Sequence, residues 1–237
     1  MKKFICLLLA LAMVLSLAAC GGDTPASTNA PQSTQATQAP ETTKAPETAA
    51  STEAAGSEAA PADANWDTKG LPAVTAGCLT GDVLITSVGQ SPEATTLANL
   101  LKRAKVDGYT LNNTVTADAV TSMYKVLVMV VGGSSKGLGG AGLDQEKETA
   151  RVTAVIDKAK ELGMTIVCMH IGGVDRRGTM SDAFIDLAFP SAQYAIVVAE
   201  GDTDNHMHDI LAKNNVPSAF VEKQMDARTV LTYMMGK

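Results

Sequence analysis

The spacing of apolar runs limits the fold of this chain more than any other feature of its sequence. Strongly apolar runs occupy residues 83–88, 125–131, 165–171 and 194–199, and weaker runs occupy 109–113 and 217–222. Each strong run is apolar at consecutive positions, as expected of strands that helices cover on both faces. Amphipathic stretches separate the runs. The pattern therefore predicts a single doubly wound α/β domain, flavodoxin-like or Rossmann-like, with a mostly parallel sheet of five or six strands and helices on both faces.

Helix-start signals lie between these runs. The expected N-caps are Ser91, which precedes a first-turn proline, Asp144, Asp204 or Asn205, and Asp226. We expect the strand order 2-1-3-4-5 with the weak sixth strand at the edge, although other doubly wound orders stay open. In that order a ligand crevice lies beyond the carboxyl ends of strands 1 and 3.

The N-terminus resembles the export signal of a bacterial lipoprotein. Lys2 and Lys3 precede a short apolar stretch, residues 4–15, and the tetrad 17–20 reads Leu-Ala-Ala-Cys. Such a stretch is typical of a cleaved signal and is too short for a spanning helix. The resemblance to a lipobox implies a signal peptide at 1–19 and a lipid on Cys20. An ordinary cleaved signal is the alternative. We expect an extracytoplasmic location with membrane attachment through Cys20.

Composition divides the rest of the chain. Residues 21–65 are rich in Thr, Ser, Ala, Pro and Gln, with six acidic residues and one lysine. This segment cannot bury enough apolar surface to order itself, so we expect residues 20–70 to form the lipidated cysteine and a disordered tether, and residues 71–237 to form the domain. The domain is mildly acidic, which argues against nucleic acid as a partner. Cys78 and Cys168 remain, either bridged or as free thiols.

The stretch GGSSKGLGGAG at 132–142 matches several motifs poorly. Gly137, Gly139 and Gly142 satisfy GxGxxG, but five residues separate the preceding strand from the first of them. A P-loop is excluded because Lys136 precedes its glycine. Residues 133–137 fit GxSxG, yet a nucleophile elbow needs a helix that begins at the serine, and we expect an irregular loop here.

Backbone geometry offers a further interpretation of this stretch. Glycine-rich segments can turn several N–H groups toward an anion, and Lys136, Arg176 and Arg177 can add positive charge at the same rim. A plain surface loop with solvated cations is the alternative.

A cluster at 201–209 combines acids with histidines. Asp202, His206 and His208 are weak metal candidates, because His206 and His208 are two residues apart on a predicted helix and point to different faces. We therefore expect no metal at this cluster, and no cofactor in the domain.

The segments TSVGQSP, VGGSSKGLGGAG, MHIGGVDRRG and EGD resemble a secreted bacterial family known as Domain of Unknown Function 6305. The resemblance covers about residues 74–223. It implies the α/β fold and the extracytoplasmic address but no reaction, and it places the site in the loops. The predicted ligand-binding residues are Gln90, Ser91, Ser134, Ser135, Lys136, Gly137, Gly139, His170, Gly172, Gly173, Arg176 and Arg177.

These residues favour the binding of a small anionic molecule at the carboxyl ends of the strands. One alternative is an extracytoplasmic hydrolase or transferase that uses Ser135 or Ser91 with His170. Another is a protein-interaction module without catalysis. The sequence does not identify the ligand.

Overall fold

The computed structural model describes residues 65–237. The predicted signal peptide, Cys20 and most of the predicted tether lie outside the described residues. Within the described part, no helix has both the length and the apolar character that a membrane span requires.

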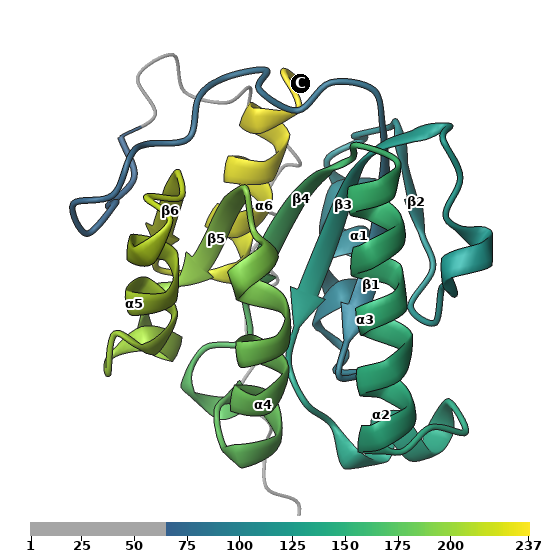
Figure 1. The fold of residues 1–237 in the computed structure, drawn as a ribbon. Coiled ribbons are helices and arrows are strands. Elements are labelled where there is room, and N and C mark those ends of the chain that lie inside the picture. The colour runs from purple at the N-terminus through teal and green to yellow at the C-terminus, as the bar shows by residue number, and fades with distance from the viewer. Residues whose placement is uncertain (1–64) are drawn as a thin grey trace, which may run out of the picture. The chain divides into compact units, whose positions relative to one another are not determined.

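A parallel sheet of six strands forms the centre of the described domain (Figure 1). Its strands are β1 (Asp82–Val88), β2 (Tyr109–Leu111), β3 (Tyr124–Val131), β4 (Thr165–His170), β5 (Tyr194–Val198) and β6 (Ser218–Val221). They follow the order β2-β1-β3-β4-β5-β6, and each neighbouring pair is parallel. The predicted fold class and strand order are confirmed. The order reverses at β1, so the crevice between the ends of β1 and β3 is present.

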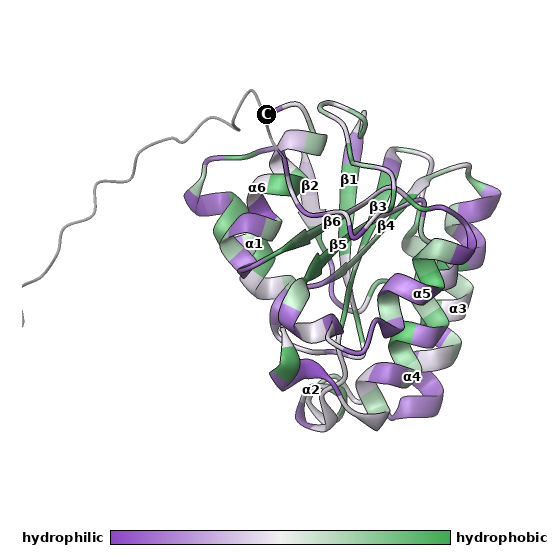
Figure 2. Cartoon of the chain, turned by 90° about the vertical axis from the view of Figure 1, so that its left-hand side faces the viewer, coloured by the Kyte–Doolittle hydropathy of each residue, from purple (hydrophilic) through white to green (hydrophobic). Residues whose placement is uncertain are grey.

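Helices cover both faces of the sheet, which makes three layers (Figure 2). The helices are α1 (Glu93–Arg103), α2 (Ser135–Gly140), α3 (Gln145–Glu161), α4 (Thr179–Ala188), α5 (His206–Lys213) and α6 (Gln224–Met234). Short 3-10 turns are η1 (Ala117–Ala119), η2 (Val174–Arg176), η3 (Phe189–Ser191) and η4 (Ala199–Asp202). One apolar cluster lies between the sheet and α3, α4 and α5, and the other lies between the sheet and α1 and α6. Strand residues alternate between these clusters because successive side chains point to opposite faces.

The predicted helix starts agree only in part with the structure. Asp144 caps α3, because its carboxylate accepts a hydrogen bond from Lys147 N at 2.8 Å. Ser91 is not a cap: α1 begins after Pro92 and no side chain caps it. Asp226 lies in the first turn of α6, where it accepts a hydrogen bond from Lys223 N. Asn205 precedes α5 in a left-handed conformation without capping it by its side chain.

The glycine-rich stretch differs most from expectation. It is not irregular, because residues 135–140 form the short helix α2. Ser134 caps this helix by accepting a hydrogen bond from Gly137 N at 3.0 Å, and Leu138 anchors it in the core. The cap and the buried side chain together outweigh the poor helix propensity of glycine.

The segment before the first strand lies against the edge of the sheet. Asp67 pairs with Phe220 of β6, and Ser218 N donates to Pro72 O at 2.8 Å. Lys69 Nζ reaches Asp202 and lies 4.6 Å from the centre of the Phe220 ring. Residues 67–70, which lie within the predicted tether, thus pack against the domain in the part of the chain that the structure describes.

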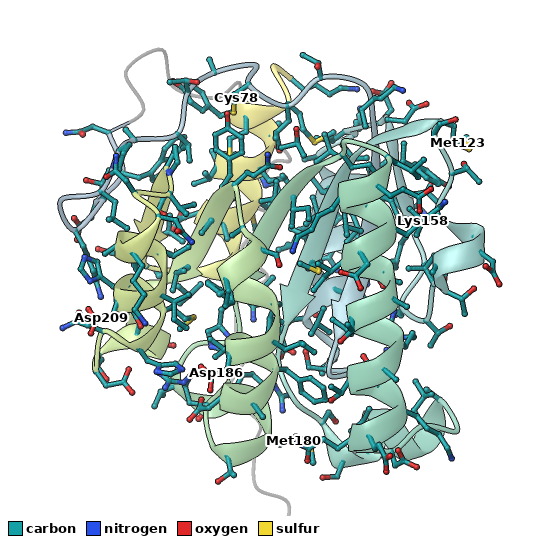
Figure 3. All side chains as sticks on the ribbon, in the orientation of Figure 1. Cys78, Met123, Lys158, Met180, Asp186 and Asp209 are labelled. Atoms are coloured by element: carbon teal, nitrogen blue, oxygen red, sulfur yellow. The ribbon has the colours of Figure 1, made fainter. Side chains whose placement is uncertain are left out.

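The two cysteines of the domain are free thiols. Cys168 is buried in β4, where burial raises the pKa of its thiol. Cys78 lies at the opposite end of the sheet from the carboxyl ends of the strands (Figure 3). The alternative of a disulfide between them is wrong, because Cys168 packs in the cluster on one face of the sheet and Cys78 packs against the cluster on the other face.

Candidate functional site

A cleft of about 650 Å³ opens at the carboxyl edge of the sheet, where β1 and β3 end. Its lining residues are Gln90, Ser91, Pro92, Thr95, Asn113, Ser134, Lys136, Gly137 and Arg176. The volume lies within the range of small-molecule sites. The structure thus brings together six of the predicted site residues, namely Gln90, Ser91, Ser134, Lys136, Gly137 and Arg176.

The turn after β1 builds one wall of the cleft. Gln90 has a φ of 56°, a left-handed conformation that costs energy for a residue other than glycine. A backbone bridge to Gly133 holds it against the end of β3. The buried carboxylate of Glu148 accepts hydrogen bonds from Gly89 N at 2.9 Å and from Gln90 Nε2 at 3.0 Å. These contacts stabilise the strained turn.

Glu148 is itself paired with a buried arginine. Arg151 Nη2 lies 2.7 Å from Glu148 Oε1, and the two side chains are 7% and 0% exposed. The guanidinium also donates to Val115 O at 2.8 Å and to Ser87 O at 2.6 Å. A buried ion pair is tolerated when further hydrogen bonds satisfy both partners, as they do here.

Within residues 65–237, three polar atoms in or beside the cleft are buried without a hydrogen-bond partner: Ser91 Oγ and Asn113 Oδ1 of its lining, and Glu93 Oε2 next to Arg176. Ser91 is 3% exposed and Glu93 is 5% exposed. An unsatisfied buried polar atom costs about 1–3 kcal/mol. Such atoms at a cleft are therefore places where a ligand or water can form hydrogen bonds that the protein does not supply.

Two cationic side chains border the same cleft. Lys136 is exposed on α2. Arg176 is half-buried and donates from Nε to Glu93 Oε1 at 2.6 Å. Its outer guanidinium nitrogens extend beyond this contact, and arginine offers five N–H donors in all. The cleft therefore combines positive charge at its rim with polar atoms at its wall.

Close packing explains several of the glycines. A β-carbon at Gly137 would lie 1.8 Å from Gln90 O, so only glycine lets α2 approach the β1 turn. A β-carbon at Gly172 would lie 2.1 Å from Arg176 Cγ, and one at Gly173 would lie 2.2 Å from a Glu200 oxygen. Gly139 faces open space. Gly172 lines a separate cavity of about 430 Å³ at the ends of β4 and β5, with Glu200, Glu222 and Lys223 among its walls.

Arg177 is engaged away from the cleft. It donates to Asp182 Oδ1 at 2.7 Å, to Gly201 O at 2.6 Å and to both carboxylate oxygens of Asp204 at 2.9 Å. The hydrogen bonds that Arg177 donates to Asp204 raise the pKa of Arg177 and hold the pKa of Asp204 well below its ordinary value. Arg177 thus ties the β4–α4 segment to the turn before α5.

His170 is buried beneath that turn. Its Nδ1 lies 3.0 Å from Val131 O and its Nε2 lies 3.2 Å from Gly173 O. Burial lowers the pKa of His170, and the hydrogen bonds to the two carbonyl groups oppose this effect. Since both nitrogens face carbonyl oxygens, neither is directed at a serine hydroxyl.

Ser135 is exposed at the first position of α2. Its Oγ contacts Met180 Sδ at 3.9 Å, where α2 meets the start of α4 (Figure 3). The helix does begin at this serine, as a nucleophile elbow requires, but the contact to Met180 provides no base.

The acid and histidine cluster around α5 has a structural role. The carboxylate of Asp202 accepts hydrogen bonds from Met207 N at 2.7 Å and from His208 N at 3.2 Å, and it pairs with Lys69. His206 Nε2 lies 2.9 Å from Asp186 Oδ1, without the alignment of a hydrogen bond. Within residues 65–237, no three His, Cys, Asp or Glu side chains are placed to hold a metal ion.

Several residues of the cleft were not among the predicted site residues: Thr95, Asn113 and the supporting Glu93, Glu148 and Arg151. Glu148 carries a signal in the sequence, because it shares a helical face with the buried Val152 and Val155. An acid on an apolar helical face needs a buried partner. Asn113 follows a weak strand and gives no comparable signal.

Replacement of Asp202 tests its structural role. We expect Asp202→Ala to lower the free energy of unfolding by about 2–4 kcal/mol, because it uncaps α5 and leaves Lys69 unpaired. Asp209→Ala, at an exposed acid in the first turn of the same helix, should change it by no more than about 0.5 kcal/mol. Chemical denaturation measures both values. Equal losses would contradict the assigned role.

The pKa of His170 predicts a pH dependence of stability. A lowered pKa means that the native state binds a proton less readily than the unfolded chain. The stability linked to neutral His170 is thus complete above its ordinary pKa of about 6.5 and is lost as the pH falls below it. Unfolding free energy should fall from about pH 7 to about pH 5, and less so in His170→Gln. His208→Gln, which keeps His170, should retain the fall. Identical slopes in all three proteins would contradict this assignment.

Comparison with known proteins extends this description. The sequence matches the model of the family described as Domain of unknown function (DUF6305) over residues 80–235. A comparison with curated proteins gives no match.

Solved structures with a similar arrangement include a GDSL-like lipase from Bacteroides thetaiotaomicron VPI-5482 and the psychrotrophic esterase EstA from Pseudoalteromonas sp.. The lipase is 8% identical with a TM-score of 0.30, and the match covers 57% of this chain and 65% of the lipase, so the chain spans less than two thirds of it. The esterase is 14% identical with a TM-score of 0.32, and the match covers 64% of this chain and 94% of the esterase. Neither likeness assigns an activity. The family match covers more than half of the chain, which therefore belongs to the DUF6305 family.

Proposed function

We propose that the domain binds a small anionic molecule in the cleft at the ends of β1 and β3. The observation that carries this proposal is the pairing of unpartnered buried polar atoms with cationic side chains in one cleft. Ser91 and Asn113 supply the polar atoms, and Lys136 and Arg176 supply the charge.

The electrostatic potential at this cleft favours an anion. The N-terminus of α1 lies at the cleft, since Pro92 and Thr95 are among the lining residues, and no side chain caps it. The positive end of a helix dipole favours a negative group by about 0.3–1 kcal/mol. Glu93 balances one of the two cationic side chains, which leaves Lys136 as the net positive charge.

Geometry supports binding better than serine catalysis. Ser135 Oγ contacts a methionine sulfur, and Ser91 Oγ has no partner. Because both nitrogens of His170 face carbonyl oxygens, the predicted pairing of a serine with His170 lacks a base. Covalent labelling of Ser91 or Ser135 by a fluorophosphonate would favour the enzymatic alternative.

A thermal-shift titration of the full chain with inorganic phosphate, succinate and citrate tests the proposal. An anion at a hundred times its dissociation constant adds about 2.7 kcal/mol, or roughly 5–10 °C in Tm for a domain of this size. Lys136→Ala should weaken the binding of every anion because it removes the net charge of the cleft.

Lys160→Ala is the matched control, since Lys160 is an exposed lysine on α3, outside the cleft. It should leave the shift unchanged. No shift with any anion, or an equal loss in the two lysine variants, would overturn the proposal.

We also propose that the chain is exported and attached to the membrane through a lipid on Cys20. This proposal rests on residues 1–20 of the sequence, where a basic start and an apolar stretch precede the Leu-Ala-Ala-Cys tetrad. Two or more acyl chains at one terminus hold a protein at a bilayer much better than one.

Metabolic labelling with palmitate in a bacterial host tests this attachment. The wild-type chain should carry label and sediment with membranes, whereas Cys20→Ala should be unlabelled and absent from the lipidated fraction. Cys78→Ala, which removes a cysteine of the domain, should keep the label. A wild-type chain without label would refute the lipid.

A further inference from the structure

We infer that the ligand is an anionic polyol, a sugar acid or sugar phosphate, whose charged group faces Lys136 and Arg176 and whose hydroxyl groups meet Ser91 and Asn113. This inference rests on the proposed function and names the ligand class of the same cleft. It follows from which hydrogen-bonding groups the cleft leaves without partners.

The unpartnered atoms mainly require hydrogen-bond donors. Asn113 Nδ2 donates to Thr95 Oγ1 at 3.0 Å, which leaves Asn113 Oδ1 as an acceptor without a donor. Glu93 Oε1 is paired with Arg176, and Glu93 Oε2 is a second acceptor without a donor. A carboxylate or phosphate alone offers only acceptors. A simple anion can therefore pair with Lys136 and Arg176, but it has no donor for the unpaired acceptor oxygens.

Ser91 connects this wall to Glu93. A β-carbon placed on Gly132 would lie 2.9 Å from Ser91 Oγ and 3.7 Å from Glu93 Oε2, so both atoms lie close to the backbone of Gly132. The hydroxyl of Ser91 makes no hydrogen bond within the protein, so a hydroxyl group of a ligand in the cleft that Ser91 lines can pair with it.

The donor on the ligand is a hydroxyl and not an ammonium group. The charge of Glu93 is already matched by Arg176 at 2.6 Å. An ammonium group would therefore add an unmatched positive charge beside Arg176 and Lys136, and like charges in a partly desolvated cleft repel. A neutral hydroxyl supplies the donor without that cost. It can also accept a hydrogen bond in return.

Arg176 is placed to bind the anionic end without leaving Glu93. Its Nε makes the contact to Glu93, and its stem packs over Gly172, where a β-carbon would lie 2.1 Å from Arg176 Cγ. The outer nitrogens remain as donors for a carboxylate or phosphate, for which the planar guanidinium is suited. The absence of a side chain at Gly172 therefore leaves room for the stem of Arg176.

Matched small molecules test the inference on the full chain by calorimetric titration. D-glucuronate and a glucose phosphate carry both an anion and hydroxyl groups. Cyclohexanecarboxylate keeps the ring and the anion without hydroxyl groups, an aminocyclohexanecarboxylate adds an ammonium group, and D-glucose lacks the anion. We expect at least one of the two hydroxylated anions to bind about tenfold or more tightly than the other three.

Substitutions of the polar residues test their part in binding separately from that of the cationic residues. Ser91→Ala and Asn113→Leu should each reduce the preference for the hydroxylated anion over cyclohexanecarboxylate by about threefold or more. Ser122→Ala and Asn99→Leu, at two exposed residues, are the controls and should leave this preference for the hydroxylated anion unchanged. Gly132→Ala, which places a methyl group against Ser91 Oγ, should also reduce this preference.

The outcomes distinguish this inference from the proposed function. If cyclohexanecarboxylate or the amino acid binds as tightly as both hydroxylated anions, and Lys136→Ala weakens that binding, the anion site stands and the polyol is wrong. If D-glucose binds as tightly as the anions, or nothing binds, the anion site itself is wrong. Preference for glucuronate over the glucose phosphate, or the reverse, identifies the anionic group.

Discussion

The buried carboxylate of Glu148 is the contact on which the cleft depends. It holds the turn after β1 through Gly89 N and the Gln90 side chain, and Arg151 neutralises it in a space closed to water. Without the Glu148 carboxylate, fewer contacts would offset the strain of the left-handed conformation of Gln90. The same turn presents the carbonyl against which Gly137 packs. One buried ion pair from α3 therefore sets the positions of β1, β3 and α2 at the cleft.

The polar groups of this edge fall into two kinds. The groups that join segments of the chain are paired: Arg151 of α3 donates to Ser87 O of β1 and to Val115 O of the segment after β2, and Arg177 ties α4 to the turn before α5. The polar groups at the cleft are not fully paired, since Ser91, Glu93 and Asn113 each leave an atom without a partner within the described residues. Proteins satisfy nearly all buried polar groups, so unsatisfied ones gathered at one cleft indicate where an external molecule forms hydrogen bonds. The structural groups and the candidate site are thus distinguished by their hydrogen bonds.

Much of the fold follows from local patterns in the sequence. Consecutive apolar residues such as those of 126–131 identify a covered parallel strand, and the cap at Asp144 marks α3. The helix in the glycine-rich stretch could not be predicted from its local pattern. Ser134 caps a helix there only because Leu138 is buried in the core, and that burial depends on distant segments. Arg176 and Arg177 are neighbours in sequence with equal charge, yet one borders the cleft and the other is tied to Asp182 and Asp204. Only contacts between distant segments separate the two, and no local pattern contains them.

A crystal structure of the chain with D-glucuronate bound would show whether this cleft is the binding site. We expect the carboxylate of the sugar on Lys136 and the outer nitrogens of Arg176, hydroxyl groups on Ser91 Oγ and Asn113 Oδ1, and Glu148 still bonded to the Gln90 turn. The proposed site is contradicted if the sugar acid lies elsewhere on the molecule while Ser91 Oγ and Asn113 Oδ1 are paired with groups of the protein itself. In that case the cleft would have no unmet hydrogen bonds to offer.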